Sequence, residues 1–197
     1  MANMTLSTIR KRVKALIREN QESSALEAYG DAATLSLNDL IDANVEPAAA
    51  AVYQTAPDEV WSDGVTTETV ANGRTAKQWV RIFSVTVGGV AAMVDVNRRS
   101  ANYDIAMDGL NGSLGTSGRP YALIEGSAVT AVPTGKAVQI SGVTLPRVSG
   151  TSISIDSMLV DAVCHWAAYL VLMAAGDGNA AAYREQAMLS MGAGGTR

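Results

Sequence analysis

The residues of this chain that come nearest to a catalytic arrangement are Asp161, His165 and Tyr169. They follow one another at intervals of four, so a helix would place all three side chains on one face. A carboxylate beside an imidazole is half of many nucleophilic sites. No Ser or Cys nucleophile is tied to the pair by spacing, since Cys164 would point about 100° away around the helix. Such a pair is more often a polar or subunit contact, and a small hydrolase using Asp161 and His165 is the alternative.

Metal and cofactor chemistry has few residues available. His165 is the chain's one histidine and Cys164 its one cysteine, so a zinc site built on them would be short of ligands. The glycine-rich stretch 109–118 lacks the Gly-Lys-Ser/Thr ending of a phosphate-binding loop, and no Gly-x-Gly-x-x-Gly follows a predicted strand. We therefore expect no catalytic residue, no metal and no cofactor, and predict that the protein is not an enzyme.

Length and composition favour a folded protein made in a reducing cytoplasm. The 197 residues can bury a substantial core, and 15 Lys and Arg against 19 Asp and Glu give a net charge of −4, which argues against a general nucleic-acid coat. The single cysteine cannot form an intrachain disulfide, and the N-terminal residues lack the apolar run of a signal peptide. The longest apolar run, 162–175, is shorter than the roughly 20 residues that span a bilayer, so no membrane helix is expected.

Helical spacing marks the first part of the chain. Apolar residues recur every three or four positions after Thr5, which can cap a helix, so we predict a helix over about 5–20 with a basic second face. The block that follows predicts a short helix around 37–41. Pro47, at a first-turn position, predicts the start of another helix over 48–53.

The hydrophobic period changes to two in the middle of the chain. Gly88 and Gly89 separate two alternating runs, which predicts a hairpin with a two-residue loop. Gly142 interrupts the alternation of a later run where a β-bulge would lie. The stretch 109–118 is predicted to be a mobile loop. The predicted strands are 80–87, 90–96, 121–125, 127–132 and 137–145.

The last part of the chain returns to helix. Ser154 or Asp156 can cap a helix running to about 175, and a second helix is predicted over 180–191, with 192–197 as a frayed tail. The whole pattern predicts an α+β fold. Residues 1–64 and a C-terminal helical hairpin in 151–197 would form a helical bundle, into which a small antiparallel β-sandwich or barrel, residues 65–150, is inserted.

Charge is distributed unevenly along the chain. Residues 1–20 carry five Lys or Arg and one acid, whereas residues 21–64 carry nine acids and no Lys or Arg. Pairing of the basic helix with the acidic block, in the same chain or the next, is favoured over nucleic-acid binding. The penultimate helix is apolar nearly all round, so a neighbouring subunit is expected to cover part of it. The predicted interface residues are Arg10, Lys11, Arg12, Lys14, Arg18, Asp39, Asp42, Glu46, Asp161, His165, Trp166 and Tyr169.

The layout resembles the head-to-tail connector proteins of tailed bacteriophages, the adaptor or ring proteins, and in particular those beneath the portal of short-tailed crAss-like gut phages. The resemblance covers most of the chain and lies in the order of segments. These are the opening amphipathic helix, Leu37-Asn38-Asp39-Leu40-Ile41 with the helix after Pro47, the strand 80–85, the segment from Tyr103 to Arg119-Pro120-Tyr121, and the closing helix 161–172 with Gly176-Asp177-Gly178-Asn179-Ala180.

The resemblance implies a non-enzymatic virion protein at the head–tail junction. Its copies would form a ring, usually twelvefold, that contacts the portal protein and neighbouring tail or ring proteins while DNA passes through the channel without specific binding. An acidic lining formed by the acids of 21–64 would suit such a channel, because it repels phosphates. No membrane is involved. The alternatives are a tail-completion or outer virion subunit, the small hydrolase, and a cytosolic DNA-binding regulator.

Overall fold

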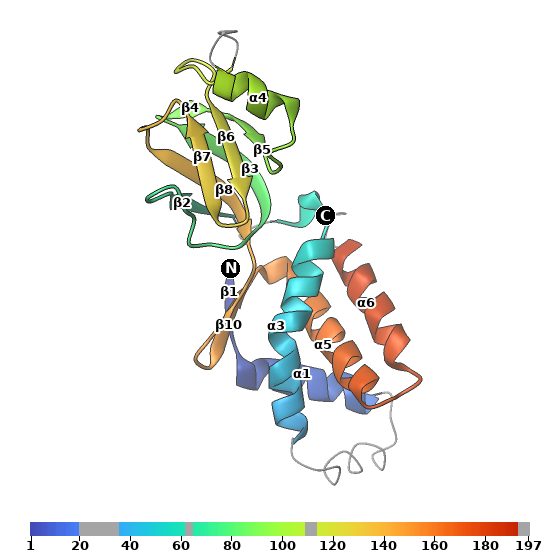
Figure 1. Cartoon of the computed structure of the whole chain (residues 1–197). Coiled ribbons are helices and arrows are strands. Elements are labelled where there is room, and N and C mark those ends of the chain that lie inside the picture. The colour runs from blue at the N-terminus through green and yellow to red at the C-terminus, as the bar shows by residue number, and fades with distance from the viewer. Residues whose placement is uncertain (20–35, 62–64, 109–113, 193–197) are drawn as a thin grey trace. The chain divides into compact units, whose positions relative to one another are not determined.

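The computed structural model describes residues 1–19, 36–61, 65–108 and 114–192 and divides the chain into two compact units (Figure 1). Met1–Gly64 and Pro146–Arg197 form the helical unit, and Val65–Leu145 form the β unit. The α+β fold predicted from the sequence is confirmed. Residues 146–150, which the sequence assigned to the β domain, include strand β9 of the helical unit. Parts of the predicted loop 109–118 and of the tail 192–197 lie outside the described residues.

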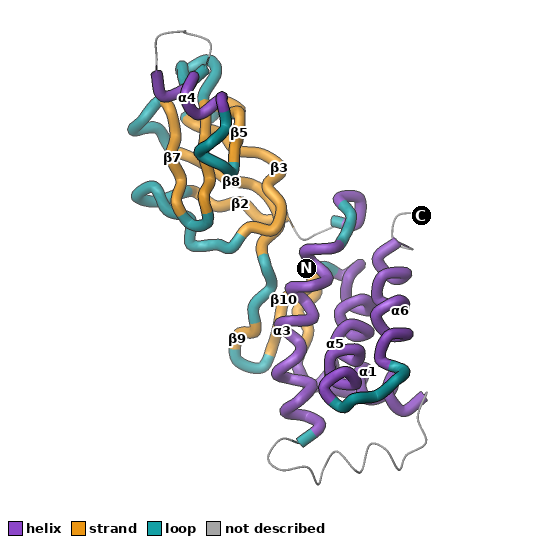
Figure 2. The backbone as a smooth tube through the Cα atoms, turned by 45° about the vertical axis from the view of Figure 1, so that its right-hand side comes forward, coloured by secondary structure: helices purple, strands orange, loops and turns teal. Residues whose placement is uncertain are grey.

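The helical unit is built around α5 (Figure 2). Apolar residues at helical spacing bury Ile9, Val13 and Ile17 on the inner face of the first helix, so its polar residues lie outside. α5 packs against α1, α3 and α6. The helices are α1 (Leu6–Glu19), α3 (Leu37–Thr55), α5 (Val160–Ala174) and α6 (Ala180–Gly192).

The composition of α5 is explained by these neighbours. Ser157–Ala174 is long and apolar enough by length and composition to cross a membrane, the one such segment in the described part of the chain, and half of it is buried inside the structure. The core helix of a globular unit has the same character. α1, α3 and α6 cover part of α5, and cover of the remainder by a neighbouring subunit stays a prediction.

A small sheet in the helical unit was not predicted. β1 (Ala2–Thr5) pairs antiparallel with β10 (Ser152–Ile155), which pairs with β9 (Val148–Ser149). Ser154 therefore lies in a strand and caps no helix. Asp156 does cap, since its carboxylate accepts from the backbone N–H of Met158 (3.0 Å) in the short 3-10 helix η2 (Ser157–Leu159) before α5.

α3 is one helix, where the sequence suggested two. Ser36 and Asp39 form a capping box at its start, and Pro47 lies inside it. A proline inside a helix loses one backbone hydrogen bond, at a cost of about 3 kcal/mol. Pro47 is exposed, whereas Ile41, Val45, Ala48, Ala49 and Val52 form a continuous buried face on both sides of it. This burial keeps the helix continuous, and Pro57 follows its end, before the 3-10 helix η1 (Asp58–Val60).

The β unit consists of two sheets. The first has the order β2-β8-β3-β4 and the second β5-β6-β7. All pairs are antiparallel except β5–β6, which is parallel. The strands are β2 (Val65–Thr69), β3 (Trp79–Val87), β4 (Val90–Ala91), β5 (Met93–Asp95), β6 (Tyr121–Glu125), β7 (Ala128–Val132) and β8 (Val138–Thr144), and α4 (Ala101–Asp108) precedes β6.

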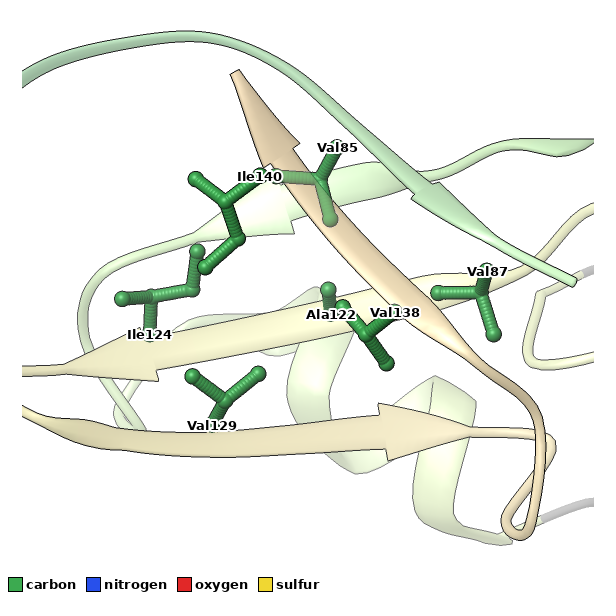
Figure 3. Close-up of a cluster of buried hydrophobic side chains, with 7 residues drawn as sticks. All are labelled: Val85, Val87, Ala122, Ile124, Val129, Val138 and Ile140. Carbon is green, nitrogen blue, oxygen red and sulfur yellow. The ribbon is translucent and has the colours of Figure 1, made fainter. Parts of the chain in front are cut away.

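Side chains from both sheets meet in one apolar core (Figure 3). Period-two alternation places them on the inner faces. A bridge between Arg74 and Ala128 connects the loop after β2 with β7, so the sandwich is partly closed into a barrel along this edge. The core residues are Val85 and Val87 of β3, Ala122 and Ile124 of β6, Val129 of β7, and Val138 and Ile140 of β8.

Glycines shape two places in the first sheet. Gly88 and Gly89 have φ of 61° and 82°, as a two-residue hairpin loop requires, and confirm the predicted turn. The predicted strand 90–96 is confirmed over 90–91 and 93–95, but it divides into β4 and β5, which belong to different sheets. Gly142 lies opposite an irregularity in β3, and a Cβ there would lie 2.1 Å from the carbonyl oxygen of Arg81. Only glycine allows this close approach.

Candidate interface

The basic face of α1 pairs with the acidic helix α3 inside one chain. Arg10 donates to Asp42 through Nε (2.6 Å) and through a second, charge-assisted bond from its terminal nitrogen. The hydrogen bond to Asp42 raises the pKa of the Arg10 guanidinium. Lys11 is exposed and Lys14 half-buried, and the side chain of Arg18 lies outside the described ones. The predicted pairing of basic and acidic segments is therefore present between α1 and α3.

The other two predicted acids of α3 also have partners. Hydrogen bonds from Ser36 lower the pKa of Asp39 at the helix start. Glu46 accepts from the guanidinium of Arg147 and from the backbone N–H of Val148 (3.1 Å), and these bonds lower its pKa. Arg147 and Val148 follow directly on the β unit in sequence, so Glu46 fixes the chain where it returns to the helical unit. An acidic channel lining receives no support from these three side chains, which are engaged within the chain.

Asp161 and His165 do not form a catalytic pair. The carboxylate of Asp161 accepts from Arg12 (2.8 Å) in an exposed ion pair. His165 Nδ1 lies 2.9 Å from the backbone oxygen of Asp161. Cys164 is buried, and burial raises the pKa of its thiol to about 11, so the reactive thiolate is disfavoured at neutral pH. This geometry supports a structural role for the helix and not the hydrolase alternative.

Trp166 and Tyr169 contribute to packing. Trp166 is buried, its ring lies 6.1 Å from that of Tyr169 in an edge-to-face arrangement, and the guanidinium of Arg184 on α6 lies 5.9 Å from the Trp166 ring. Tyr169 is half-buried. Of the residues predicted for an interface on α5, Asp161 is the one with a well-exposed side chain.

Several exposed apolar residues were not predicted for an interface. Met158 in η2 and Met188 and Leu189 in α6 are 41%, 47% and 63% exposed, and η2 and α6 contact each other. The sequence could have indicated Met188 and Leu189. The apolar residues of 180–191 follow no single helical stripe, so some of them must lie on an exposed face of that helix. Arg147 was also missed, and no pattern in the sequence connects it with Glu46.

Within the described residues, no group of three or more His, Cys, Asp or Glu side chains could hold a metal ion. The exposed apolar residues Met158, Met188 and Leu189 are of the kind found on surfaces that bind other proteins.

The comparison with protein families agrees with this class. The family model described as SU10 adaptor protein matches residues 4–195, nearly the whole chain. No curated protein matches the sequence. The chain belongs to the SU10 adaptor protein family, and it is therefore a phage structural adaptor protein, a virion component. The resemblance to phage head–tail adaptors drawn from segment order is confirmed at the level of the family.

Proposed function

We propose that this protein is the subunit of a ring, twelvefold in its most common form, that surrounds the DNA channel and joins the portal protein to the next tail component. The observation that carries the proposal is the family match, which spans both units of the chain. The subunit would fold in the cytoplasm of the bacterial host, take its place at the head–tail junction, and have no catalytic activity.

Exposed apolar surface on the helical unit supports contacts with other subunits. Single exposed apolar residues are normal, but Met158, Met188 and Leu189 come from two elements that contact each other. A group of this kind is typical of the centre of a protein interface, where apolar side chains lose contact with water. We assign this surface, the Met158–Leu189 surface, to a neighbouring subunit or to the portal protein.

The charge pattern of α1 supports passage of DNA without specific binding. Arg10 and Arg12 are already paired with Asp42 and Asp161, so two cations of the basic face are compensated within the chain. A specific or tight DNA contact needs several cations free to replace phosphate counterions. The DNA-binding regulator would bind duplex DNA at low salt with an affinity that falls steeply as salt rises. Absence of a gel shift at low salt, together with assembly, would favour the ring.

The test is sedimentation velocity of the purified protein, alone and mixed with purified portal protein. The proposal predicts species at high multiples of the 20.5 kDa subunit, either alone or on the portal. The double variant Met188→Lys with Leu189→Lys should lose them, whereas Ala181→Lys, an exposed control on the same helix, should retain them. A wild-type protein that stays at 20.5 kDa under both conditions would contradict the proposal.

A further inference from the structure

A pocket of about 610 Å³ opens at one end of the β unit. It lies where β3 begins, at Trp79, and where β5 and β6 end, at Val96 and Ile124. Trp79 and Ile82 also pack against the apolar core, so the pocket is a mouth of the partly closed barrel. Barrel mouths are common binding sites, because the divergence of two sheets leaves apolar side chains only partly covered.

A buried hydroxyl group holds the pocket wall in place. Thr75 is 4% exposed, and its Oγ1 accepts from the indole Nε1 of Trp79 (2.9 Å) and from the backbone N–H of Lys77 (3.1 Å) while it donates to Glu68. The ammonium of Lys77 lies 5.9 Å from the centroid of the Trp79 ring. Trp79 and Lys77 are therefore held before any partner arrives, which lowers the entropy lost on binding.

The lining of this pocket has a definite chemistry. Val96, at 70% exposure, and the half-buried Trp79 and Ile82 present an apolar surface. Lys77 is the one charged residue in the lining. The complementary group is an apolar side chain next to a carboxylate.

The same unit presents that chemistry on α4. Asp104, Ile105, Met107 and Asp108 line one open depression, and Ile105 and Met107 are 37% and 51% exposed. Ala106, between them in sequence, is buried against Tyr121 and Leu123 of β6. Ala106 fixes α4 on its own sheet, so Ile105 and Met107 lie on either side of the buried line of the helix, and Asp104 and Asp108 lie on its outer side. The two acids thus lie between two partly exposed apolar side chains on this part of α4.

We propose that the α4 face of one copy docks in the barrel-mouth pocket of the next copy. The proposal rests on the ring proposed above, because a contact between two different faces of the same protein closes only by rotation. Ile105 and Met107 lie against Trp79 and Val96 of the neighbour, and Lys77 lies near Asp104 or Asp108. The contact links β units around the ring, in addition to any contact made by the helical unit.

Charge reversal tests the contact on the full-length protein. Lys77→Glu, and separately Asp104→Lys with Asp108→Lys, should each raise the protein concentration at half-assembly about tenfold, because like charges then meet at the interface. The triple variant that carries all three changes should assemble nearly as wild type. Lys136→Glu, an exposed charge reversal in the same unit outside the pocket, is the control and should have no effect.

Cysteine cross-linking gives an independent readout of geometry. A chain with both Val96→Cys and Met107→Cys should form, on mild oxidation of assembled protein, a ladder of covalent oligomers beyond the dimer. Each single variant should stop at the dimer or below, and the native Cys164 is buried. A ladder is expected only if pocket and α4 face come from different copies and follow one another head to tail.

The outcomes separate the two proposals. If wild type never assembles, alone or on the portal, the ring fails and this contact fails with it. If wild type assembles and all charge variants assemble equally, with no ladder, the contact alone is overturned. If the variants form normal rings but recruit less of another virion protein, the pocket binds that protein, and docking of a second copy is overturned as well.

Discussion

Both units have a buried apolar core, and they differ in the contacts that join segments far apart in sequence. In the helical unit, ion pairs join segments far apart in sequence: Arg10 with Asp42, Arg12 with Asp161, and Arg147 with Glu46. In the β unit the core is shared by two sheets, and the buried hydroxyl of Thr75 and the Arg98–Glu125 ion pair add polar contacts. Of these pairs, Arg10–Asp42 joins the basic segment 1–20 with the acidic segment 21–64, so part of the uneven charge distribution is used to fold the helical unit. It is not by itself a sign of assembly.

The largest expected effects come from the two cores, and they test whether the units are independent. Leu159 in the helical unit and Ile140 in the β unit are both fully buried. Leu159→Ala and Ile140→Ala should each lower the free energy of unfolding by about 2–5 kcal/mol, through lost transfer energy and a cavity. Hydrogen exchange followed by mass spectrometry should show lost protection in the mutated unit only. Equal loss in both units from either variant would show that they unfold together.

A smaller effect is expected at the closest backbone approach in the β unit. Gly142→Ala places a methyl group against the Arg81 carbonyl, so the strands must shift, at a cost of about 1–3 kcal/mol. Gly118→Ala is the matched control, since a Cβ there meets nothing within 4 Å. Thermal unfolding of both variants measures the difference. Equal melting temperatures would mean that the backbone of β3 can shift away from position 142 without loss of stability.

The charge pairs of the helical unit predict a pH dependence that the β core does not share. The folded-state pKa of Glu46 is lowered, chiefly by the bond from Arg147, so the unfolded chain takes up this proton first as pH falls. The stability that Glu46 contributes is complete above its ordinary pKa near 4.5 and is lost as pH falls through the lowered value.

Glu46→Gln should therefore destabilise the helical unit by about 1 kcal/mol at neutral pH, and the difference from wild type should shrink on acidification. Urea unfolding at a series of pH values measures this. Glu185→Gln, an exposed acid on α6, should follow the wild-type profile. A Glu46→Gln profile parallel to wild type at every pH would remove Glu46 as a stabilising contact.

The smallest effect is expected at the most exposed pair. The side chains of Arg12 and Asp161 are 48% and 73% exposed, so solvent screens their attraction. Arg12→Ala should lower the free energy of unfolding by less than about 1 kcal/mol at low salt and by no measurable amount at high salt. Urea unfolding at two salt concentrations checks this. A large loss that persists in high salt would mean that Arg12 also packs as part of the core.

The periodicity of apolar residues predicted most helices and several strands. It did not predict the elements whose bounds or pairing depend on contacts between distant parts of the chain. The helix 5–20, the Gly88–Gly89 turn and the Asp156 cap follow from local chemistry and are present. The continuous α3 could not be predicted from Pro47, because burial on both sides outweighs the lost hydrogen bond. The pairing of β1 with β10 joins segments about 150 residues apart in sequence, and no local signal specifies it.

For the predicted interface residues, the sequence indicated that basic and acidic side chains would pair, but it did not show which residue pairs with which. Opposite charges on 1–20 and 21–64 led to the Arg10–Asp42 pair, since a long-range charge imbalance is visible in composition. The spacing of Asp161 and His165 did not reveal that Arg12 takes the carboxylate. Lys77 and α4 were not predicted as a complementary pair, because the pocket exists only once β3, β5 and β6 are assembled.

The number of copies of this chain in the intact virion tests the central claim most directly. Quantitative mass spectrometry of purified particles, calibrated against the portal protein, gives that number. A ring subunit at the head–tail junction predicts many copies per particle in a fixed ratio to the portal, near one ring of twelve. A single copy per particle, or its absence from particles that are complete and infectious, would contradict the account.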